Sequence, residues 1–188
     1  RNLISLSWPV LISQCLNMIG PVVDTLWVSK LGASSVAGVG IAAMVVTLTN
    51  AGIMGLLAGL RALLARFIGA RDNDEAIHVA RQALAVTILH SVVIALIGIF
   101  LAKPILQIFG VDADVVHEGA TYLRLQLVGI ITMSLYTFTT NIMQTVGDTV
   151  TPMKISLVLR VIHITLAPFF IMGYWIFPRL GVSGAALS

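Results

Sequence analysis

The sequence predicts an all-α integral membrane protein built as a bundle of six transmembrane helices. Of its 188 residues, 58% are hydrophobic and 10% are charged, whereas about a quarter of the residues in a soluble domain are charged. The apolar residues come in runs of about 20 or more, which is the length that a helix needs to cross a bilayer. The net charge of +3 is spread between the runs without a basic cluster, so we expect no nucleic-acid partner.

Five apolar runs and the start of a sixth are expected to form one transmembrane domain over residues 1–188. The five runs cover residues 3–28, 36–60, 79–102, 122–146 and 153–177, and the sixth opens at residue 182. Because the chain begins at Arg1 and stops soon after the sixth run opens, we expect a piece of a longer protein with a truncated sixth helix. The single Cys15 allows no internal disulfide.

The first run contains Asp24, which is the one acidic residue inside an apolar run of this chain. A carboxylate at the centre of a membrane helix costs roughly 2.5–3.5 kcal/mol, and such residues usually serve as ion or proton sites. The alternative is an interfacial residue within reach of water. Trp27 and Lys30 lie beyond Asp24 and mark the interface better, so we expect Asp24 to be functional.

Two prolines, Pro9 and Pro21, lie in the same run. Each removes a backbone donor and clashes with the carbonyl four residues back, so we expect both to kink the helix. Asn17 and Asp24 are seven residues apart and share a helix face. Asn17 is therefore a candidate cavity residue, with an ordinary hydrogen bond between helices as the alternative.

The second run contains the pair Gly55 and Gly59, a spacing that lets membrane helices pack closely. A charged stretch, Arg61–Arg81, follows it and is expected to be a solvated loop. Its four arginines place it on the cytoplasmic side. The protein is therefore expected to be multi-pass in the cytoplasmic membrane of a bacterium or archaeon, with its N-terminus inside. Asn73 or Asp74 is expected to cap the third helix.

Further polar candidates lie in the fourth and fifth runs. Asn141 and Gln144 are three residues apart near the inner end of the fourth run, and Arg160 and His163 are three apart inside the fifth. A buried arginine needs a partner or a water-filled cavity, although Arg160 could instead extend to the cytoplasmic end. No nucleophile–base or paired-acid constellation accompanies them. We therefore expect no enzyme, no cofactor and no firm metal site.

Five blocks of sequence share an order and spacing with one protein family. They are Trp8–Ile12 with Val23–Val28, Ile68–Arg71 with Gln82–Leu84, Phe109–Gly110 with Tyr122–Arg124, Gln144–Thr149 with Thr151–Pro152, and Gly181–Ala186. In this arrangement the chain resembles the N-terminal lobe of the multidrug and toxin extrusion (MATE) transporters. The resemblance implies one lobe of a twelve-helix transporter, with the C-terminal lobe and the lipid bilayer as its partners.

The resemblance further implies an antiporter that exports organic, often cationic, drugs by alternating access, driven by H⁺ or Na⁺. Asp24 falls on the position of the family's coupling acid, and Pro9 on that of a proline that bends. His163 and Ala167 stand where one branch carries an Asn and an Asp. This departure removes oxygen ligands, so it weakens a Na⁺ site at Asp24 and favours a proton route. The alternatives are a relative of the flippases for lipid-linked substrates, or a fragment without transport activity of its own.

Overall fold

The computed structural model describes residues 3–173 and 181–187, and these residues fold into helices without a strand. The helices are α1 (Leu3–Val28), the short 3-10 helix η1 (Ser29–Leu31), α2 (Ala33–Gly69), α3 (Asn73–Gln107), α4 (Ala113–Thr145), α5 (Val150–Met172) and α6 (Val182–Leu187). The predicted all-α fold class is confirmed.

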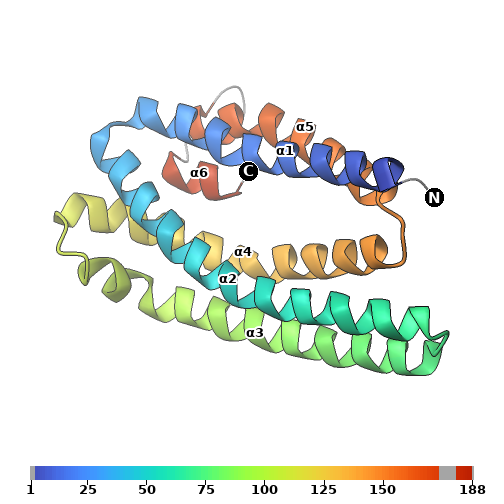
Figure 1. Ribbon diagram of the computed structural model, residues 1–188. Coiled ribbons are helices and arrows are strands. Elements are labelled where there is room, and N and C mark those ends of the chain that lie inside the picture. The colour runs from blue at the N-terminus through green and yellow to red at the C-terminus, as the bar shows by residue number, and fades with distance from the viewer. Residues whose placement is uncertain (1–2, 174–180, 188) are drawn as a thin grey trace.

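The helices form two sets that meet at α4 (Figure 1). In one set, α1 lies beside α5, and α6 packs against α5. In the other set, α2, α3 and α4 pack against one another. α4 also contacts α6, while direct contact between α1 and α2 is slight. α1 is therefore held mainly by α5, and this pairing positions the candidate site.

The buried apolar residues fall into two clusters at different depths of the bundle. The larger cluster draws on all six α-helices and includes Val28, Ala42, Leu106, Leu123, Leu127, Ala167, Ile171 and Val182. The smaller cluster lies near the α2–α3 turn and includes only residues of α2, α3 and α4, among them Ile53, Leu57, Leu64 and Phe138. The two sets of helices therefore share a core at one end of the bundle, and at the other end α1 and α5 stand outside it.

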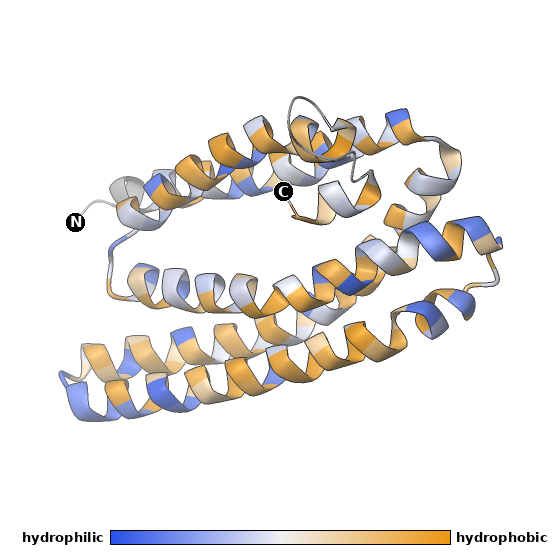
Figure 2. Ribbon diagram, turned by 180° about the vertical axis from the view of Figure 1, so that it is seen from behind, coloured by the Kyte–Doolittle hydropathy of each residue, from blue (hydrophilic) through white to orange (hydrophobic). Residues whose placement is uncertain are grey.

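Hydrophobic residues predominate along the helices, and in α2 and α3 the hydrophilic residues gather at the helix ends (Figure 2). Many of the large hydrophobic side chains are exposed. Four of the described helices, α1, α2, α3 and α5, are long and apolar enough to cross a membrane. α4, expected to span the membrane over residues 122–146, is not among these four. It packs against α2, α3 and α6 and carries more polar residues, which a helix surrounded by protein tolerates more easily than one facing lipid.

The closest approach of α2 and α4 is at Gly38 and Gly119. A Cβ added at Gly38 would lie 2.8 Å from the backbone nitrogen of Gly119 and 2.9 Å from the carbonyl oxygen of Val115. By contrast, a Cβ added at Gly55 or Gly59 would meet nothing within 4 Å. The expectation that the Gly55–Gly59 pair packs against another helix is therefore wrong for the described part of the chain.

The charged stretch 61–81 is not a long loop. α2 runs to Gly69 and α3 begins at Asn73, so only a three-residue turn separates them, with Arg71 at a left-handed φ of 59°. The cap of α3 is Asp72, whose carboxylate accepts a hydrogen bond from the backbone N–H of Glu75 at 3.2 Å. The prediction of Asn73 or Asp74 as the cap was thus wrong by one or two residues. The last expected residues of the fifth span, 174–177, lie outside the described residues.

Candidate functional site

Asp24 of α1 and His163 of α5 lie in contact. Nε2 of the imidazole is 3.1 Å from Oδ1 of the carboxylate, and the two side chains are 13% (His163) and 17% (Asp24) exposed. The pairing follows directly from the packing of α1 beside α5, which brings their two polar faces together. The structure thus gives the acid of the first helix a titratable partner from the fifth helix.

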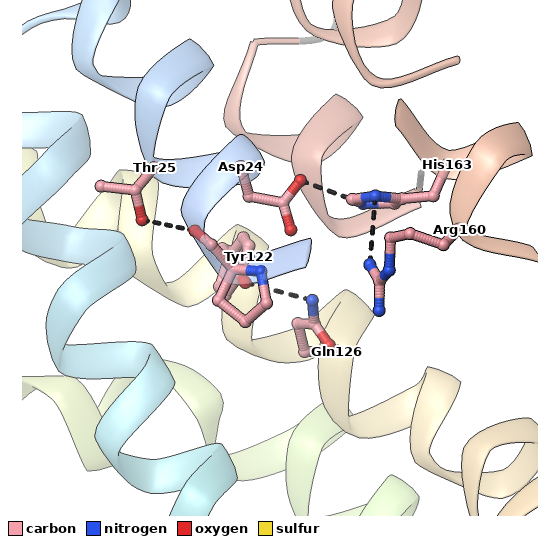
Figure 3. A network of polar contacts seen from close by, with 7 residues as sticks. Asp24, Thr25, Tyr122, Gln126, Arg160 and His163 are labelled. Carbon is pink, nitrogen blue, oxygen red and sulfur yellow. Dashed lines mark hydrogen bonds and ion pairs between the residues drawn. The ribbon is translucent and has the colours of Figure 1, made fainter. Parts of the chain in front are cut away.

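Arg160 extends this contact on the other side of the imidazole (Figure 3). Its Nη1 atom lies 3.3 Å from Nδ1 of His163, three residues further along the same face of α5. A guanidinium has five N–H donors and no acceptor. Arg160 therefore donates this hydrogen bond, and His163 stands between a cationic and an anionic side chain.

Gly20 of α1 makes room for the guanidinium. It is buried, and a Cβ added there would lie 2.7 Å from Cζ of Arg160 and closer still to Nη1. Real Cβ atoms do not approach other heavy atoms so closely, so the space beside Gly20 is already filled by Arg160. Gly20 precedes Asp24 by one helical turn, and both residues face α5.

Two polar atoms in this group are buried without a well-aligned hydrogen bond among the described residues, namely Oδ1 of Asp24 and Nε of Arg160. The 3.1 Å approach of the imidazole to Oδ1 is thus a close electrostatic contact with imperfect direction. Unpaired buried polar atoms are costly, so the pair at this contact calls for a physical reason.

α4 contributes a second polar pair beside Asp24. The hydroxyl of Tyr122 accepts a hydrogen bond from Nε2 of Gln126 at 3.1 Å, and the phenol lies within electrostatic range of the Asp24 carboxylate. Neither residue was among the predicted site residues. Their spacing of four residues on one helix face was the available signal, but nothing in the sequence placed that face opposite α1.

The two prolines of α1 lie inside a helix that continues from Leu3 to Val28. Hydroxyl groups one turn later hydrogen-bond to their carbonyls: Ser13 donates to Pro9 at 2.9 Å, and Thr25 donates to Pro21 at 2.7 Å. Pro9 is buried, whereas Pro21 is exposed. Both thus lie where a bend in α1 would move Asp24 relative to α5.

The remaining candidate residues lie apart from Asp24. Asn17 is exposed on α1, and Asn141 is buried and donates to the carbonyl of Thr137 at 2.7 Å. Gln144 lines a hollow of about 440 Å³ between the beginning of α1 and the ends of α2 and α4. Its lining residues are Ser7, Val10, Leu11, Arg61, Gln144, Thr145 and Thr149.

The surroundings of Asp24 offer few oxygen ligands for a hard cation. Ala167 is completely buried, and the neighbouring polar atoms from α5 are the nitrogens of His163 and Arg160. Among the described residues no three His, Cys, Asp or Glu side chains cluster. Hard cations such as Na⁺ prefer several oxygen ligands, whereas the polar atoms that α5 brings to Asp24 are nitrogens.

Comparison with curated proteins finds relatives over the whole chain. The probable multidrug resistance protein YoeA of Bacillus subtilis is 32% identical over 181 residues, which span 96% of this chain and 39% of YoeA. The probable multidrug resistance protein NorM of Bacillus cereus is 28% identical over 188 residues, which span 100% of this chain and 42% of NorM. The chain therefore covers about two fifths of the length of these relatives.

Comparison with solved structures also finds relatives that match nearly the whole chain. A MATE protein in complex with MaL6 superposes with a TM-score of 0.90 at 28% identity, and the match covers 98% of this chain and 40% of the other. A MOP superfamily transporter from Pyrococcus furiosus superposes with a TM-score of 0.88 at 28% identity and the same coverage. The MatE family model matches residues 9–169. With most of its length matched in sequence and nearly all of it in structure, the chain belongs to the MatE family of transporters.

Proposed function

We propose that this chain is the N-terminal lobe of an antiporter that exports organic, often cationic, drugs in exchange for a cation, with Asp24 as the coupling residue. The observation that carries the proposal is the largely buried contact between Asp24 and His163, whose side chains are 17% and 13% exposed. The names of the relatives, which are multidrug resistance proteins, support the class of substrate.

The coupling step is the protonation of Asp24. A proton that arrives from outside neutralises the carboxylate, and a neutral carboxyl is far less costly to enclose among apolar helices than a charged one. α1 then packs more closely against α5, with Pro9 and Pro21 giving it places to bend. Moving one positive charge inward is worth about 2.3 kcal/mol per 100 mV of membrane potential, which is enough to drive export when several protons or a pH gradient contribute.

The drug occupies a cavity between this lobe and a second one, and the two lobes rock to expose it alternately to the two sides. The polar residues Asn17, Asn141 and Gln144 are the candidates for contact with it. Met18 and Met133 are exposed, and methionine adapts its shape to varied apolar ligands. The lobe lies in the cytoplasmic membrane with the α2–α3 turn inside, because the four arginines of the stretch 61–81 lie in that turn and in the helix ends beside it.

The test is drug efflux from cells that express the native protein containing this chain. Asp24→Asn keeps the size of the side chain and removes its ability to gain and lose a proton. We expect it to abolish efflux and its dependence on external pH. Asp114→Asn, which changes an exposed acid in the first turn of α4, is the control and retains efflux. If Asp24→Asn pumps like the unmodified protein, Asp24 does not couple transport.

A further inference from the structure

We propose that Arg160 is a positioning residue that fixes His163 as the neutral tautomer with its proton on Nε2, so that Asp24 alone receives the coupling proton. The role of Asp24 rests on the proposed function. The tautomer of His163 does not, because it follows from the contacts of the imidazole.

The donors and acceptors around the ring determine its tautomer. Arg160 approaches Nδ1 at 3.3 Å and can only donate, so Nδ1 must accept and carries no proton. A neutral imidazole has its one proton on the other nitrogen. Nε2 therefore carries it, and this N–H lies 3.1 Å from Oδ1 of Asp24. The uncharged ring thus accepts a hydrogen bond from the guanidinium on one side and faces the carboxylate on the other.

A second proton on His163 would need to sit on Nδ1. It would place an N–H against the N–H of Arg160 and a positive charge against a guanidinium at 3.3 Å. Such a contact is repulsive, so Arg160 would have to withdraw first. While Arg160 stays in place, Nδ1 is closed to a second proton, and Asp24 is the remaining member of the three contacting side chains that can take one.

Gly20 holds Arg160 in this place by leaving room for it. The guanidinium occupies the space that any Cβ at this position would take. A side chain at Gly20 would push the guanidinium away from α1 and disturb its hydrogen bond to His163. Gly20 and Arg160 thus act on the same contact from two helices, which gives two independent ways to disturb it.

The other elements around the site bring no competing charge. α4 presents Tyr122 and Gln126, which hydrogen-bond to each other, and the described residues of α6 include no titratable group. Lys30, beyond the end of α1, lies over the ring of Trp27 with its ammonium 4.0 Å from the centroid. The ionisable residues of α2, Arg61 and Arg66, lie in its last turns. The proton balance of His163 is therefore set by Arg160 and Asp24.

The test is nitrogen NMR of the native protein containing this chain, labelled at histidine and held in lipid nanodiscs. The His163 signal is identified by its loss in His163→Asn. At neutral pH we expect Nδ1 to carry no proton and Nε2 to carry one. In Arg160→Gln we expect the proton to be shared between the two nitrogens, so that their signals reveal a mixture of the two neutral tautomers. Arg160→Lys, which restores a cationic donor, is expected to recover at least part of the original behaviour.

A matched pair of glycine variants repeats the test without touching Arg160. Gly20→Ala is expected to give the same mixture of neutral tautomers at His163 as Arg160→Gln. Gly55→Ala makes the same change in α2, where a Cβ meets nothing within 4 Å, and is expected to leave the His163 signal unchanged. A proton on Nδ1 in the unmodified protein would overturn the proposal, as would a His163 signal unaffected by both Arg160→Gln and Gly20→Ala. Loss of efflux plays no part in these readings, so a failure here is distinct from a failure of Asp24 as the coupling residue.

Discussion

At the scale of single residues, the site is a row of three side chains from two helices. Asp24 and Arg160 carry opposite charges, and His163 touches both of them. A buried charge that loses its partner strongly destabilises the folded state. The intact pair adds little to the free energy of unfolding, because removing both charges from water offsets most of their attraction. The row is therefore expected to matter more for where a proton is held than for how stable the lobe is.

The sequence identified these three residues as candidates because charged and titratable side chains are rare in membrane helices. It did not reveal that they touch, since that depends on the pairing of α1 with α5. Gly20 was missed for the same reason. Nothing in the sequence of α1 distinguishes a glycine that accommodates a guanidinium from one that faces lipid.

The energetic coupling of Asp24 and Arg160 can be measured by a double-mutant cycle. Asp24→Asn and Arg160→Gln each leave one charge without its counterpart, so each is expected to lower the stability of the lobe. The double variant is expected to be more stable than the sum of the two losses implies, with a coupling of about 1–2 kcal/mol. Thermal unfolding in detergent, followed by circular dichroism, gives the values. Pairing Arg160→Gln with the exposed Asp114→Asn is the control, for which additive effects are expected; additive effects at Asp24 would contradict the coupling.

At the scale of helices, the sequence located the apolar core of each span better than its ends. α2 was expected over residues 36–60 and runs over Ala33–Gly69, and α3 was expected over 79–102 and runs over Asn73–Gln107. Hydropathy falls where a helix leaves the membrane, but its backbone hydrogen bonds continue through the charged residues beyond. Most of the residues that were expected to form a long loop, 61–81, therefore belong to the ends of α2 and α3, which extend beyond the apolar parts of these helices.

The contact of α2 with α4 yields a prediction about stability. Gly38→Ala forces a methyl group against the backbone of Gly119 and Val115, and overpacking of this kind typically costs about 1–3 kcal/mol. Gly40→Ala lies two residues away, where a Cβ meets nothing within 4 Å. It is expected to be neutral, or to stabilise α2 by up to about 1 kcal/mol, because alanine favours helix. Thermal unfolding measures the stabilities of the two variants. If they are equally stable, the prediction is wrong, and α2 and α4 can move apart at Gly38 at little cost.

The start of α5 is expected to weaken in acid. Asp148 accepts a hydrogen bond from the backbone N–H of Thr151 at 3.0 Å, which lowers the pKa of its carboxyl below the ordinary value of 3.8. A carboxyl with a lowered pKa in the folded state stabilises that state above its unfolded pKa, and the contribution is lost as the pH falls through the folded pKa. Asp148→Asn should therefore be less stable than the unmodified protein near neutral pH and approach it below about pH 4. Unfolding followed over this pH range checks the convergence, and a constant difference would contradict it.

At the scale of the whole molecule, the arrangement of the helices leaves α1 with few contacts apart from those to α5, as the proposed movement of α1 requires. α1 joins the rest of the lobe chiefly through α5, and the smaller apolar cluster includes neither helix. The family could be recognised from the sequence because the five blocks keep their order along the chain. The separation of the helices into two sets could not, because hydropathy shows which residues avoid water but not which helix each of them packs against.

The charges of the site also predict which ion drives transport. With Asp24 ionised, Arg160 already balances it, so a bound Na⁺ would add an uncompensated charge beside a guanidinium and find few oxygens to replace its water. A proton adds the same charge but forms a covalent bond to the carboxylate and needs no ligand shell. We therefore expect drug uptake into inverted membrane vesicles to collapse when the proton gradient is dissipated and to be unaffected when Na⁺ is omitted. Asp114→Asn vesicles serve as the matched control for both treatments. Uptake that needs a Na⁺ gradient in the unmodified protein would mean that Arg160 leaves the site during the cycle and that Na⁺ takes its place beside Asp24.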